Sequence, residues 1–312
     1  MKRLSLLALA IVLLFATTAT AQDWQIIPFQ LDATLTGVTF VHRDTGFVVS
    51  ADGSWARTAD AGQTWHKGSI DPTVKLEDIS FLNGTTGLVC GSRGSLYLTT
   101  DGGSNWQDVS SGDTAHIFFD IEWLAPQIAL AIGADRSAKM PITGVAFRST
   151  DGGLTWKKLE PMGIGYSEIC VRADGAVYFP SFNQLLRSNN QGRTWTRTST
   201  FDKKQARALS LYGKTGLMAG PGGMCAISND SGKTWTMVTQ TESSTFVTAE
   251  LIDEQSGYIG GPNSMMMYTT DSGQTWKQEL LPISFHILDM CRIDNRVYAV
   301  GSDGTITYKK LK

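Results

Sequence analysis

The stretch Ser228–Trp235, SNDSGKTW, decides the fold because the chain repeats it. Asp, Ser and Gly favour a tight turn, and the closing tryptophan is a large apolar side chain that needs cover. Aligned on this tryptophan, the further copies are Thr58–Trp65, Thr99–Trp106, Ser149–Trp156, Ser188–Trp195 and Thr269–Trp276. Six copies of one turn indicate a repeat architecture.

The spacing of the tryptophans gives the size and number of the repeats. The tryptophans that close successive copies of this turn lie 41, 50, 39, 40 and 41 residues apart, and Trp24 lies 41 residues before Trp65. Trp24 is therefore a seventh tryptophan in register, although it has no turn of its own. The C-terminal stretch RVYAVGSDGTITYKKLK, from Arg296, supplies the inner strands of a unit and then stops. We expect the N-terminal strand to complete that last unit.

Each unit also repeats an order of short strands. In the second unit these are EDISFL (Glu77–Leu82), TGLVCGS (Thr86–Ser92), SLYLTTD (Ser95–Asp101) and the strand after the tryptophan. Four short strands per unit, separated by turns and without helical periodicity, indicate a propeller. The sequence therefore predicts an all-β, seven-bladed β-propeller over residues 22–312, closed by the N-terminal strand so that no sheet edge is left open.

The repeated turn has a structural explanation. Its Asp carboxylate can accept N–H groups of the turn, the preceding Ser or Thr adds another contact, and its Gly permits a positive φ. The fourth copy has Asn190 at the Asp position, which an acceptor role tolerates and a catalytic acid does not. We therefore assign no catalytic residue. The predicted structural set is Asp60, Trp65, Asp101, Trp106, Asp151, Trp156, Asn190, Trp195, Asp230, Trp235, Asp271, Trp276 and Trp24.

The first 21 residues read as a secretory signal peptide. They combine the basic Lys2 and Arg3 with an apolar run and a small-residue end, and the run is shorter than a membrane anchor. Cleavage before Gln22 removes two of the 27 basic residues and none of the 29 acidic ones, leaving a net charge of −4. We expect an exported monomer, periplasmic or secreted, without an integral membrane segment after cleavage. The acidic balance argues against nucleic acid as a partner.

Cysteines and histidines give no metal signature. Cys90, Cys170, Cys225 and Cys291 are far apart in strand-like runs, and the favoured interpretation is unpaired core thiols, although an exported protein can pair them. The four histidines form no HxH or HxxxH pair. We predict no metal and no cofactor.

The repeated turn resembles the Asp box, or BNR repeat, of sialidases, some endoglucanases and sortilin-type receptors. The fuller unit VCGSRGSLYLTTDGGSNW, with seven units near 40 residues, is similar to the YCF48-like group, the photosystem II stability and assembly factor-like proteins. This resemblance covers Gln22–Lys312. It implies a non-catalytic exported scaffold that binds a macromolecule, either a protein or a glycan.

Propeller geometry places the candidate binding residues on one face. A surplus of about ten residues falls in a predicted loop, Gly133–Val145, with Asp135, Arg136 and Lys139; loops on a rigid scaffold often bind, but insertions there are also merely tolerated. Acids that begin inner strands would gather at the channel mouth and hold a cation or basic peptide, or simply solvate the channel: Asp78, Asp120, Glu168 and Asp289. A third candidate is the basic loop with Lys203, Lys204 and Arg207, which is also typical of an ordinary soluble surface.

The alternative function is a sialidase-like or endoglucanase-like glycoside hydrolase of the Asp-box kind. The Arg-Ile-Pro signature of sialidases is missing, since QIIPF (Gln25–Phe29) has Ile where the Arg belongs. Other glycosidases need two carboxylates at a set separation, and no pair stands out in the sequence. A sugar-binding protein would need exposed aromatics: Trp123 occupies a core position, and Trp55 can point either way.

Overall fold

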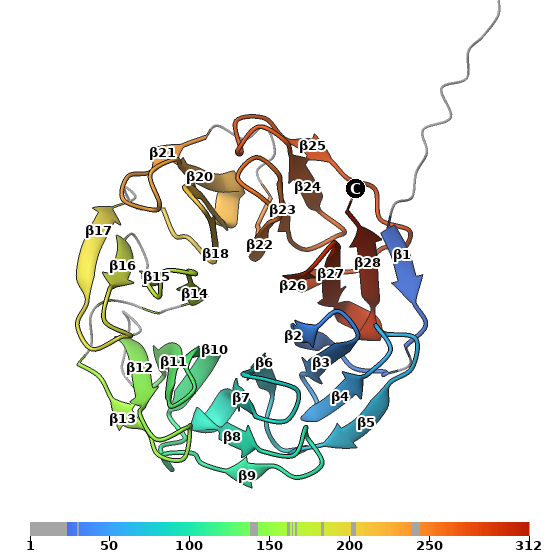
Figure 1. The fold of residues 1–312 in the computed structure, drawn as a ribbon, viewed down its shortest axis with the longest axis vertical. Helices are drawn as coiled ribbons and strands as arrows, with labels where there is room; N and C mark the ends of the chain where they lie inside the picture. The colour runs from blue at the N-terminus through green and yellow to red at the C-terminus, as the bar shows by residue number, and fades with distance from the viewer. Residues whose placement is uncertain are drawn as a thin grey trace, which may run out of the picture.

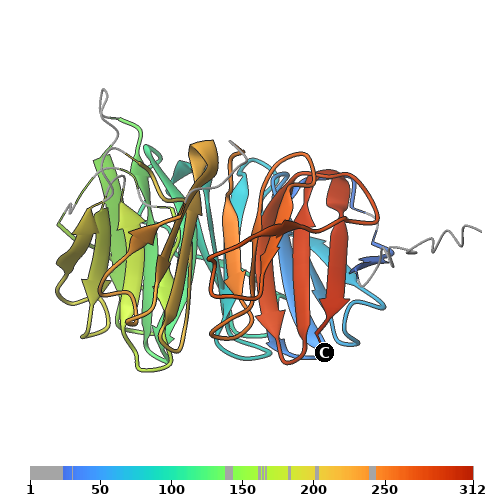
Figure 2. The ribbon, with the colours of Figure 1, turned by 90° about the horizontal axis from the view of Figure 1, so that it is seen from above.

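The computed structural model describes residues 24–29, 31–137, 143–160, 163, 165, 167–181, 184–200, 204–238 and 244–311. The chain forms seven four-stranded antiparallel sheets, arranged as blades around a central axis with the first strand of each blade innermost (Figure 1). Viewed from the side, the ring is a flat disc whose strands run between two faces (Figure 2). The predicted all-β, seven-bladed propeller is confirmed.

The first three blades follow the chain from residue 35. Blade 1 has β2 (Leu35–His42), β3 (Thr45–Ser50), β4 (Ser54–Thr58) and β5 (His66–Ser69). Blade 2 has β6 (Leu76–Phe81), β7 (Gly87–Gly91), β8 (Leu96–Thr99) and β9 (Gln107–Asp108). Blade 3 has β10 (His116–Ala125), β11 (Ile128–Asp135), β12 (Thr143–Ser149) and β13 (Lys157–Lys158).

Blades 4 to 6 repeat this order. Blade 4 has β14 (Cys170–Val171), β15 (Val177–Ser181), β16 (Gln184–Ser188) and β17 (Thr196–Thr200). Blade 5 has β18 (Ala208–Tyr212), β19 (Thr215–Gly220), β20 (Met224–Ser228) and β21 (Thr236–Met237). Blade 6 has β22 (Thr248–Leu251), β23 (Gly257–Gly260), β24 (Met266–Thr269) and β25 (Lys277–Gln278).

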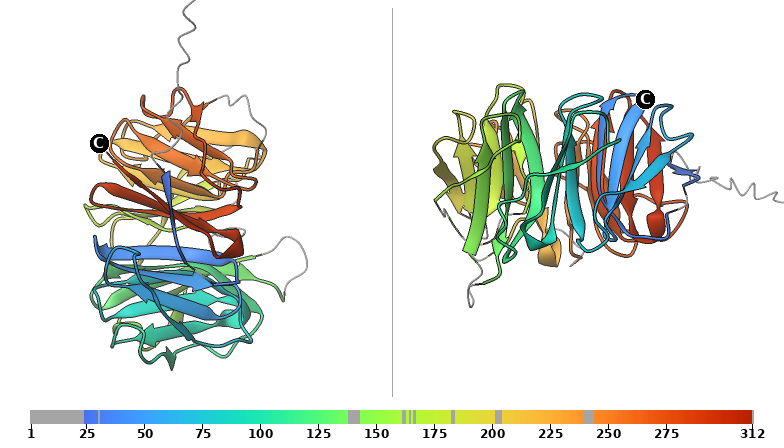
Figure 3. Two further views of the ribbon diagram at one scale, coloured as in Figure 1. Left: turned by 90° about the vertical axis from the view of Figure 1, so that its right-hand side faces the viewer. Right: turned by 90° about the horizontal axis from the view of Figure 1, so that it is seen from below.

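Blade 7 joins the two ends of the described chain. Its inner strands are β26 (Ile287–Ile293), β27 (Arg296–Gly301) and β28 (Ile306–Lys310), and its outer strand is β1 (Trp24–Ile27). Strand β1 pairs antiparallel with β28, so that Trp24 lies opposite Lys309 and Ile27 opposite Ile306. Figure 3 shows β1 lying against the last strands of the chain. The predicted closure by the N-terminal strand is confirmed.

The core is divided into seven apolar clusters, one between each pair of neighbouring blades. In each blade, the tryptophan that keeps the repeat spacing packs against the apolar cluster between that blade and the preceding one. Trp156, for example, lies between blades 2 and 3. Trp24 occupies the same place between blades 6 and 7, where its ring meets Tyr258 edge-on at 5.6 Å between centroids. The seven indoles therefore fill the wedge-shaped gaps between sheets, which is how they stabilise the ring.

Two sequence predictions need correction. The surplus near Gly133–Val145 is not simply a loop, because β11 and β12 extend into it and pair Gly133 with Val145 and Asp135 with Thr143. All four cysteines are thiols rather than half-cystines, but only Cys90 and Cys225 are fully buried core thiols. The side chains of Cys170 and Cys291 are half-buried because both lie on innermost strands.

Trp55 and Trp123 are both buried. Trp123 confirms the core position predicted for it, and Trp55 lies within β4, where it packs in the cluster between blades 1 and 2. No helix within the described part of the chain is long and apolar enough to cross a membrane.

Candidate functional site

The ring has two faces with different connections. One face, called the box face here, carries the repeated turns and the turns between the two innermost strands of each blade. These two kinds of turn hydrogen-bond to each other; in blade 2, the Gly102 N–H donates to the Thr85 carbonyl at 2.8 Å. The loop face carries the other connections, such as 92–94 and 109–115, which meet where Gly94 contacts the carbonyl of Asp113. The candidate binding residues belong to the loop face or to the axis beneath it.

Each box turn is closed by its own side chains. In blade 5 the Asp230 carboxylate accepts the Thr234 N–H at 2.8 Å and the Thr234 hydroxyl at 2.6 Å, and the Ser228 hydroxyl accepts the Gly232 N–H at 2.9 Å. Partial desolvation opposes ionisation of Asp230, but the hydrogen bonds from Thr234 and Ser228 outweigh it and lower its pKa to about 2. The box carboxylate is thus ionised and occupied by donors of its own turn.

Asn190 makes the same contacts in blade 4. Its Oδ1 accepts the Thr194 N–H and the Ser188 hydroxyl, each at 2.9 Å, while its Nδ2 donates to the Thr194 hydroxyl. The amide therefore reproduces the acceptor geometry of the carboxylate, as the sequence predicted.

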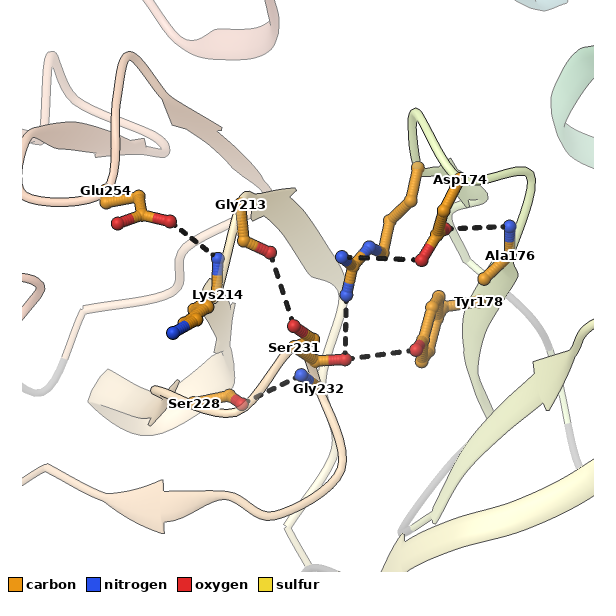
Figure 4. Close-up of polar contacts among 10 residues, drawn as sticks. Asp174, Ala176, Tyr178, Gly213, Lys214, Ser228, Ser231, Gly232 and Glu254 are labelled. Carbon is orange, nitrogen blue, oxygen red and sulfur yellow. Dashed lines mark hydrogen bonds and ion pairs between the residues drawn. The ribbon is translucent and has the colours of Figure 1, made fainter.

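The box face is also cross-linked between blades. The carbonyl of Ser231, in the box of blade 5, accepts the Tyr178 hydroxyl and the Arg172 guanidinium from blade 4, both at 3.0 Å (Figure 4). In the same view Glu254 of blade 6 accepts the Lys214 N–H of blade 5 at 2.9 Å. These bonds tie the box-face turns of blades 4, 5 and 6 together, and beside them Lys214, Glu254 and Gln255 are among the residues that line a cavity of about 590 Å³.

The predicted acids of the inner strands occupy equivalent positions around the axis. Asp78 lies in β6, Asp120 in β10 and Asp289 in β26, and Glu168 lies two residues before β14. Each accepts a backbone N–H of the next blade. The distances are 3.0 Å from Ile121 to Asp78, 2.8 Å from Ile169 to Asp120, 2.7 Å from Leu209 to Glu168 and 2.8 Å from Val38 to Asp289. These acids therefore bridge neighbouring blades, which the sequence did not predict.

Sequence reasoning missed two further acids. Glu122 follows Asp120 by two residues in β10, and Glu250 holds the equivalent position in β22. In blade 2 this position is occupied by Ser80, two residues after Asp78. The Glu122 carboxylate accepts the Ser80 hydroxyl at 2.7 Å across the interface between blades 2 and 3. The period of two along a strand was the available signal, because residues two apart point to the same side. We call Asp78, Asp120, Glu122, Glu168, Glu250 and Asp289 the axial acids.

Burial sets the charge state of the axial acids. Desolvation raises the pKa of Asp78 to about 6, of Glu122 to about 7 and of Glu250 to about 8. For Asp120, Glu168 and Asp289, burial is the largest cause of a raised pKa and neighbouring carboxylates raise it further, whereas the N–H donors of Ile169, Leu209 and Val38 act to lower it. The axis is therefore a place where ionisation is costly without a positive partner.

The Asp135 region is held by local contacts. Its Oδ1 accepts the N–H and hydroxyl of Ser137 at 2.8 and 2.6 Å, and its Oδ2 lies 4.0 Å from Nε2 of the buried His116. The backbone of Arg136 bonds to Ala115 at 3.0 Å. Lys139 lies outside the described residues.

The basic loop is only partly described. Lys204 and Arg207 are exposed on the loop face, and Lys203 lies outside the described residues. Arg207 sits where β18 begins, and its N–H bonds to Ala219 in β19 at 2.8 Å. In the part of the chain that the structure describes, no group of three or more His, Cys, Asp or Glu is arranged to hold a metal ion.

Several solved structures share the fold of this chain. A solved structure of YCF48 bound to a D1 peptide superposes with a TM-score of 0.77 at 18% identity, covering 93% of this chain and 98% of that chain. YCF48 from Cyanidioschyzon merolae gives 0.75 at 16% identity, with 92% and 98% covered. Virginiamycin B lyase from Staphylococcus aureus gives 0.76 at 11% identity, with 93% and 98% covered, which shows a shared fold alone.

The sequence comparison is more selective than the structural one. No curated protein matches the sequence. A family model described as photosynthesis system II assembly factor YCF48 matches residues 16–180, which is more than half of the chain. The chain therefore belongs to the photosynthesis system II assembly factor YCF48 family.

Proposed function

We propose that this chain is an exported, non-catalytic scaffold that binds a protein partner through its loop face. Membership of the YCF48 family supports a role in assembly, and a related YCF48 has been solved with a D1 peptide. The observation that carries the choice of face is the distribution of exposed apolar side chains.

Three large apolar side chains are exposed on the loop face side. Phe119 is 37% exposed at the axial end of blade 3, and Leu280 and Ile283 are 65% and 42% exposed in the connection from β25 to β26. Leu280 and Ile283 lie in one connection, and exposed apolar side chains that are grouped within a polar rim are typical of a protein-binding surface. On the box face, Leu154 is 51% and Tyr212 41% exposed. Leu154 lies among turns whose polar groups bond to one another, and the guanidinium of Arg292 lies 5.3 Å from the centroid of the Tyr212 ring and covers part of it.

Affinity capture with paired variants tests the choice of face. The tagged full chain is incubated with envelope extract of the source cells, and the captured proteins are identified by mass spectrometry. We expect Phe119→Ser with Leu280→Ser to lose the partner and Leu154→Ser to keep it. Equal capture by both variants would remove the loop face from the proposal.

Export is tested separately. Fractionation of the source cells, followed by N-terminal sequencing of the mature protein, is expected to place it outside the cytoplasm with Gln22 as its first residue. A mature chain that retains Met1 would contradict the export part of the proposal.

A further inference from the structure

Among the six repeated turns, only the box of blade 4 lacks an aspartate. In blade 5 the Thr234 hydroxyl donates its proton to the Asp230 carboxylate at 2.6 Å. In blade 4 this bond is reversed, because Nδ2 of Asn190 donates to the Thr194 hydroxyl oxygen at 2.8 Å. The other end of the amide fixes this direction, since Oδ1 accepts the Thr194 N–H at 2.9 Å. The hydroxyl proton of Thr194 therefore has no acceptor within the box and is available to a group outside it.

Thr194 lines a cleft between blades 3 and 4. The cleft has a volume of about 340 Å³, with Lys157–Glu160 of blade 3 on one wall and Arg193–Trp195 of the blade 4 box on the other. The side chains of Lys157 and Arg193 are both exposed and belong to opposite walls. Two cationic groups and an available hydroxyl proton thus border one space.

Arg148 adds a third positive group beside this cleft. Arg148 lies opposite Lys157 in the pairing of β12 with β13, so both side chains point to the same side of blade 3. That side faces blade 4, because Nε of Arg148 donates to the Gln191 carbonyl of the box at 2.7 Å. Burial, and then the positive charge of Arg193, lower the pKa of Arg148. The two guanidinium groups are close enough to repel each other, and an anion between them would relieve that repulsion.

The balance of charge indicates the kind of anion. Arg148, Lys157 and Arg193 carry three positive charges, and Glu160 is the one acid among the described residues that line the cleft. Lys158 also lines it, but its ammonium group lies 3.2 Å from Nε2 of the buried histidine of β10. The surplus of two positive charges matches a phosphate group, which carries about −1.5 to −2 charges near pH 7 and offers several acceptor oxygens.

The corresponding cleft between blades 1 and 2 has a different chemistry. It measures about 290 Å³ and is lined by Lys67 of β5 and by Asn105 and Trp106 of the blade 2 box. There the box keeps its carboxylate, and Asp101 accepts the side-chain amide of Asn105 at 2.8 Å. The Lys67 ammonium lies over the Phe29 ring, 5.0 Å from its centroid. This cleft therefore has a negative charge where the cleft of blades 3 and 4 has a neutral amide.

We propose that Lys157, Arg193 and Thr194 bind a phosphate monoester group in the cleft between blades 3 and 4. The two cationic side chains would contact phosphate oxygens from opposite walls, and the Thr194 hydroxyl would donate to one of them. A soluble phosphate compound and a lipid headgroup present the same group, so both are candidate carriers. The site lies at the outer strands rather than on the loop face, and it does not rest on the proposed function.

The test follows the indole N–H signals of the isotope-labelled protein by NMR while inorganic phosphate is added at pH 8 and low ionic strength. Trp195 reports on the proposed site and Trp106 on the cleft between blades 1 and 2. We expect the Trp195 signal to shift to saturation and the Trp106 signal to stay in place. Sodium chloride at matched ionic strength is the ligand control. An equal shift of Trp195 in chloride, or an equal response of Trp106, would overturn the site.

Variants assign the binding to the neutral box. Asn190→Asp restores the residue of the other five boxes, so the fold should survive, but it adds a negative charge and takes up the Thr194 proton. We expect this variant and Arg193→Gln each to raise the dissociation constant for phosphate about tenfold or more. Lys233→Gln, at the same place in the blade 5 box, is the matched control and should leave the constant unchanged. An unchanged constant in Asn190→Asp, or an equal loss in Lys233→Gln, would overturn the proposal.

Vesicle sedimentation identifies the carrier of the phosphate. Phosphatidic acid presents a phosphate monoester at a membrane surface, and phosphatidylcholine vesicles are the control without one. Sedimentation with phosphatidic acid that Asn190→Asp abolishes would support the site and assign a lipid headgroup. A phosphate-induced shift of Trp195 without sedimentation would support the site and assign a soluble compound. Sedimentation that Asn190→Asp leaves intact would overturn the lipid assignment.

Discussion

The box carboxylates and the axial acids belong to one chain but occupy opposite electrostatic environments. Asp271 is only partly buried and accepts the Thr275 hydroxyl and N–H at 2.5 and 2.8 Å, and these hydrogen bonds lower its pKa. Asp120 is buried and accepts a single N–H while facing other acids, which raises its pKa. Burial raises the pKa of an aspartate and hydrogen-bond donors lower it, so the balance of the two decides whether the side chain is charged.

The largest expected effect tests whether Asp120 supports the contact between blades 3 and 4 as a hydrogen-bond acceptor or as a negative charge. Asp120→Ala leaves the buried Ile169 N–H without an acceptor and should lower the free energy of unfolding by about 2–3 kcal/mol. Asp120→Asn keeps an acceptor and adds a donor for Asp78, so its cost should stay below about 1 kcal/mol. Urea unfolding at pH 7 measures both. Equal losses would mean that the charge of Asp120, and not its hydrogen bond, supports the blade contact.

The next effect is the pH dependence of stability. Glu122 has an ordinary pKa of 4.5 when unfolded and about 7 when folded, so between these values the folded state holds more protons. The contribution of Glu122 to stability should therefore fall by about 1–2 kcal/mol as the pH rises from about 5 to 7, after allowance for solvent screening, and stay constant above pH 7. Unfolding at a series of pH values checks this.

A double variant supplies the control for that profile. Glu122→Gln with Glu250→Gln removes two groups whose pKa burial raises, and the decline toward pH 8 should become shallower. Asp230→Asn removes a group whose pKa is lowered to about 2 and should alter the profile only below about pH 4. If Asp230→Asn also made the fall in stability above pH 5 shallower, the contrast between the box carboxylates and the axial acids would be wrong.

A smaller effect is expected in the boxes. Asp151→Ala removes acceptors for Thr155 and Ser149 and should cost about 1 kcal/mol, since the turn is partly solvated. Asp151→Asn should cost less, because Asn190 already makes the equivalent contacts in blade 4. Thermal unfolding of the two variants is the measurement, and a larger loss for Asn than for Ala would be the contrary result.

The smallest effect concerns the thiol of Cys291. Burial, and then the carboxylates of Asp289 and Glu250, raise its pKa. Alkylation by iodoacetamide at pH 8 should be slow in the folded protein, and Glu250→Gln should speed it by about twofold, because it removes a neighbouring negative charge. Mass spectrometry of the alkylated peptide follows the rate, with the fully buried Cys90 as the internal reference. An unchanged rate would place Glu250 outside the field felt by this thiol.

Most of the fold could be predicted from the sequence because the repeat is both local and periodic. The turn at Ser228–Trp235 fixes its own hydrogen bonds, and equal spacing of the tryptophans fixes the number of blades. Trp24 also indicated the closure, since it keeps the spacing without a box. The extension of β11 and β12 into the surplus was not predictable, because Gly133–Val145 carries turn residues and no clear alternation.

The candidate site was only partly predictable. The register of the inner strands brought Asp78, Asp120, Glu168 and Asp289 to equivalent positions, as expected from their place in the repeat. Their bonds to the next blade depend on the distance between sheets, which no single unit encodes. Glu122 was missed because Asp120 precedes it in the same strand, and Glu250 because Thr248 stands in β22 where β6, β10 and β26 have an acid. The bulge that exposes Phe119 appears only when two strands are paired.

The pairing of β1 with β28 in blade 7 has a consequence for how two molecules of this protein can associate. Strand β1 has only four residues, yet it covers the edge of β28 and buries Trp24 beside Tyr258. If β1 detached, the bared edge would accept an identical segment from a second molecule as readily as its own. Strand exchange between two rings, at high protein concentration, is therefore the route to oligomers that this architecture leaves most open.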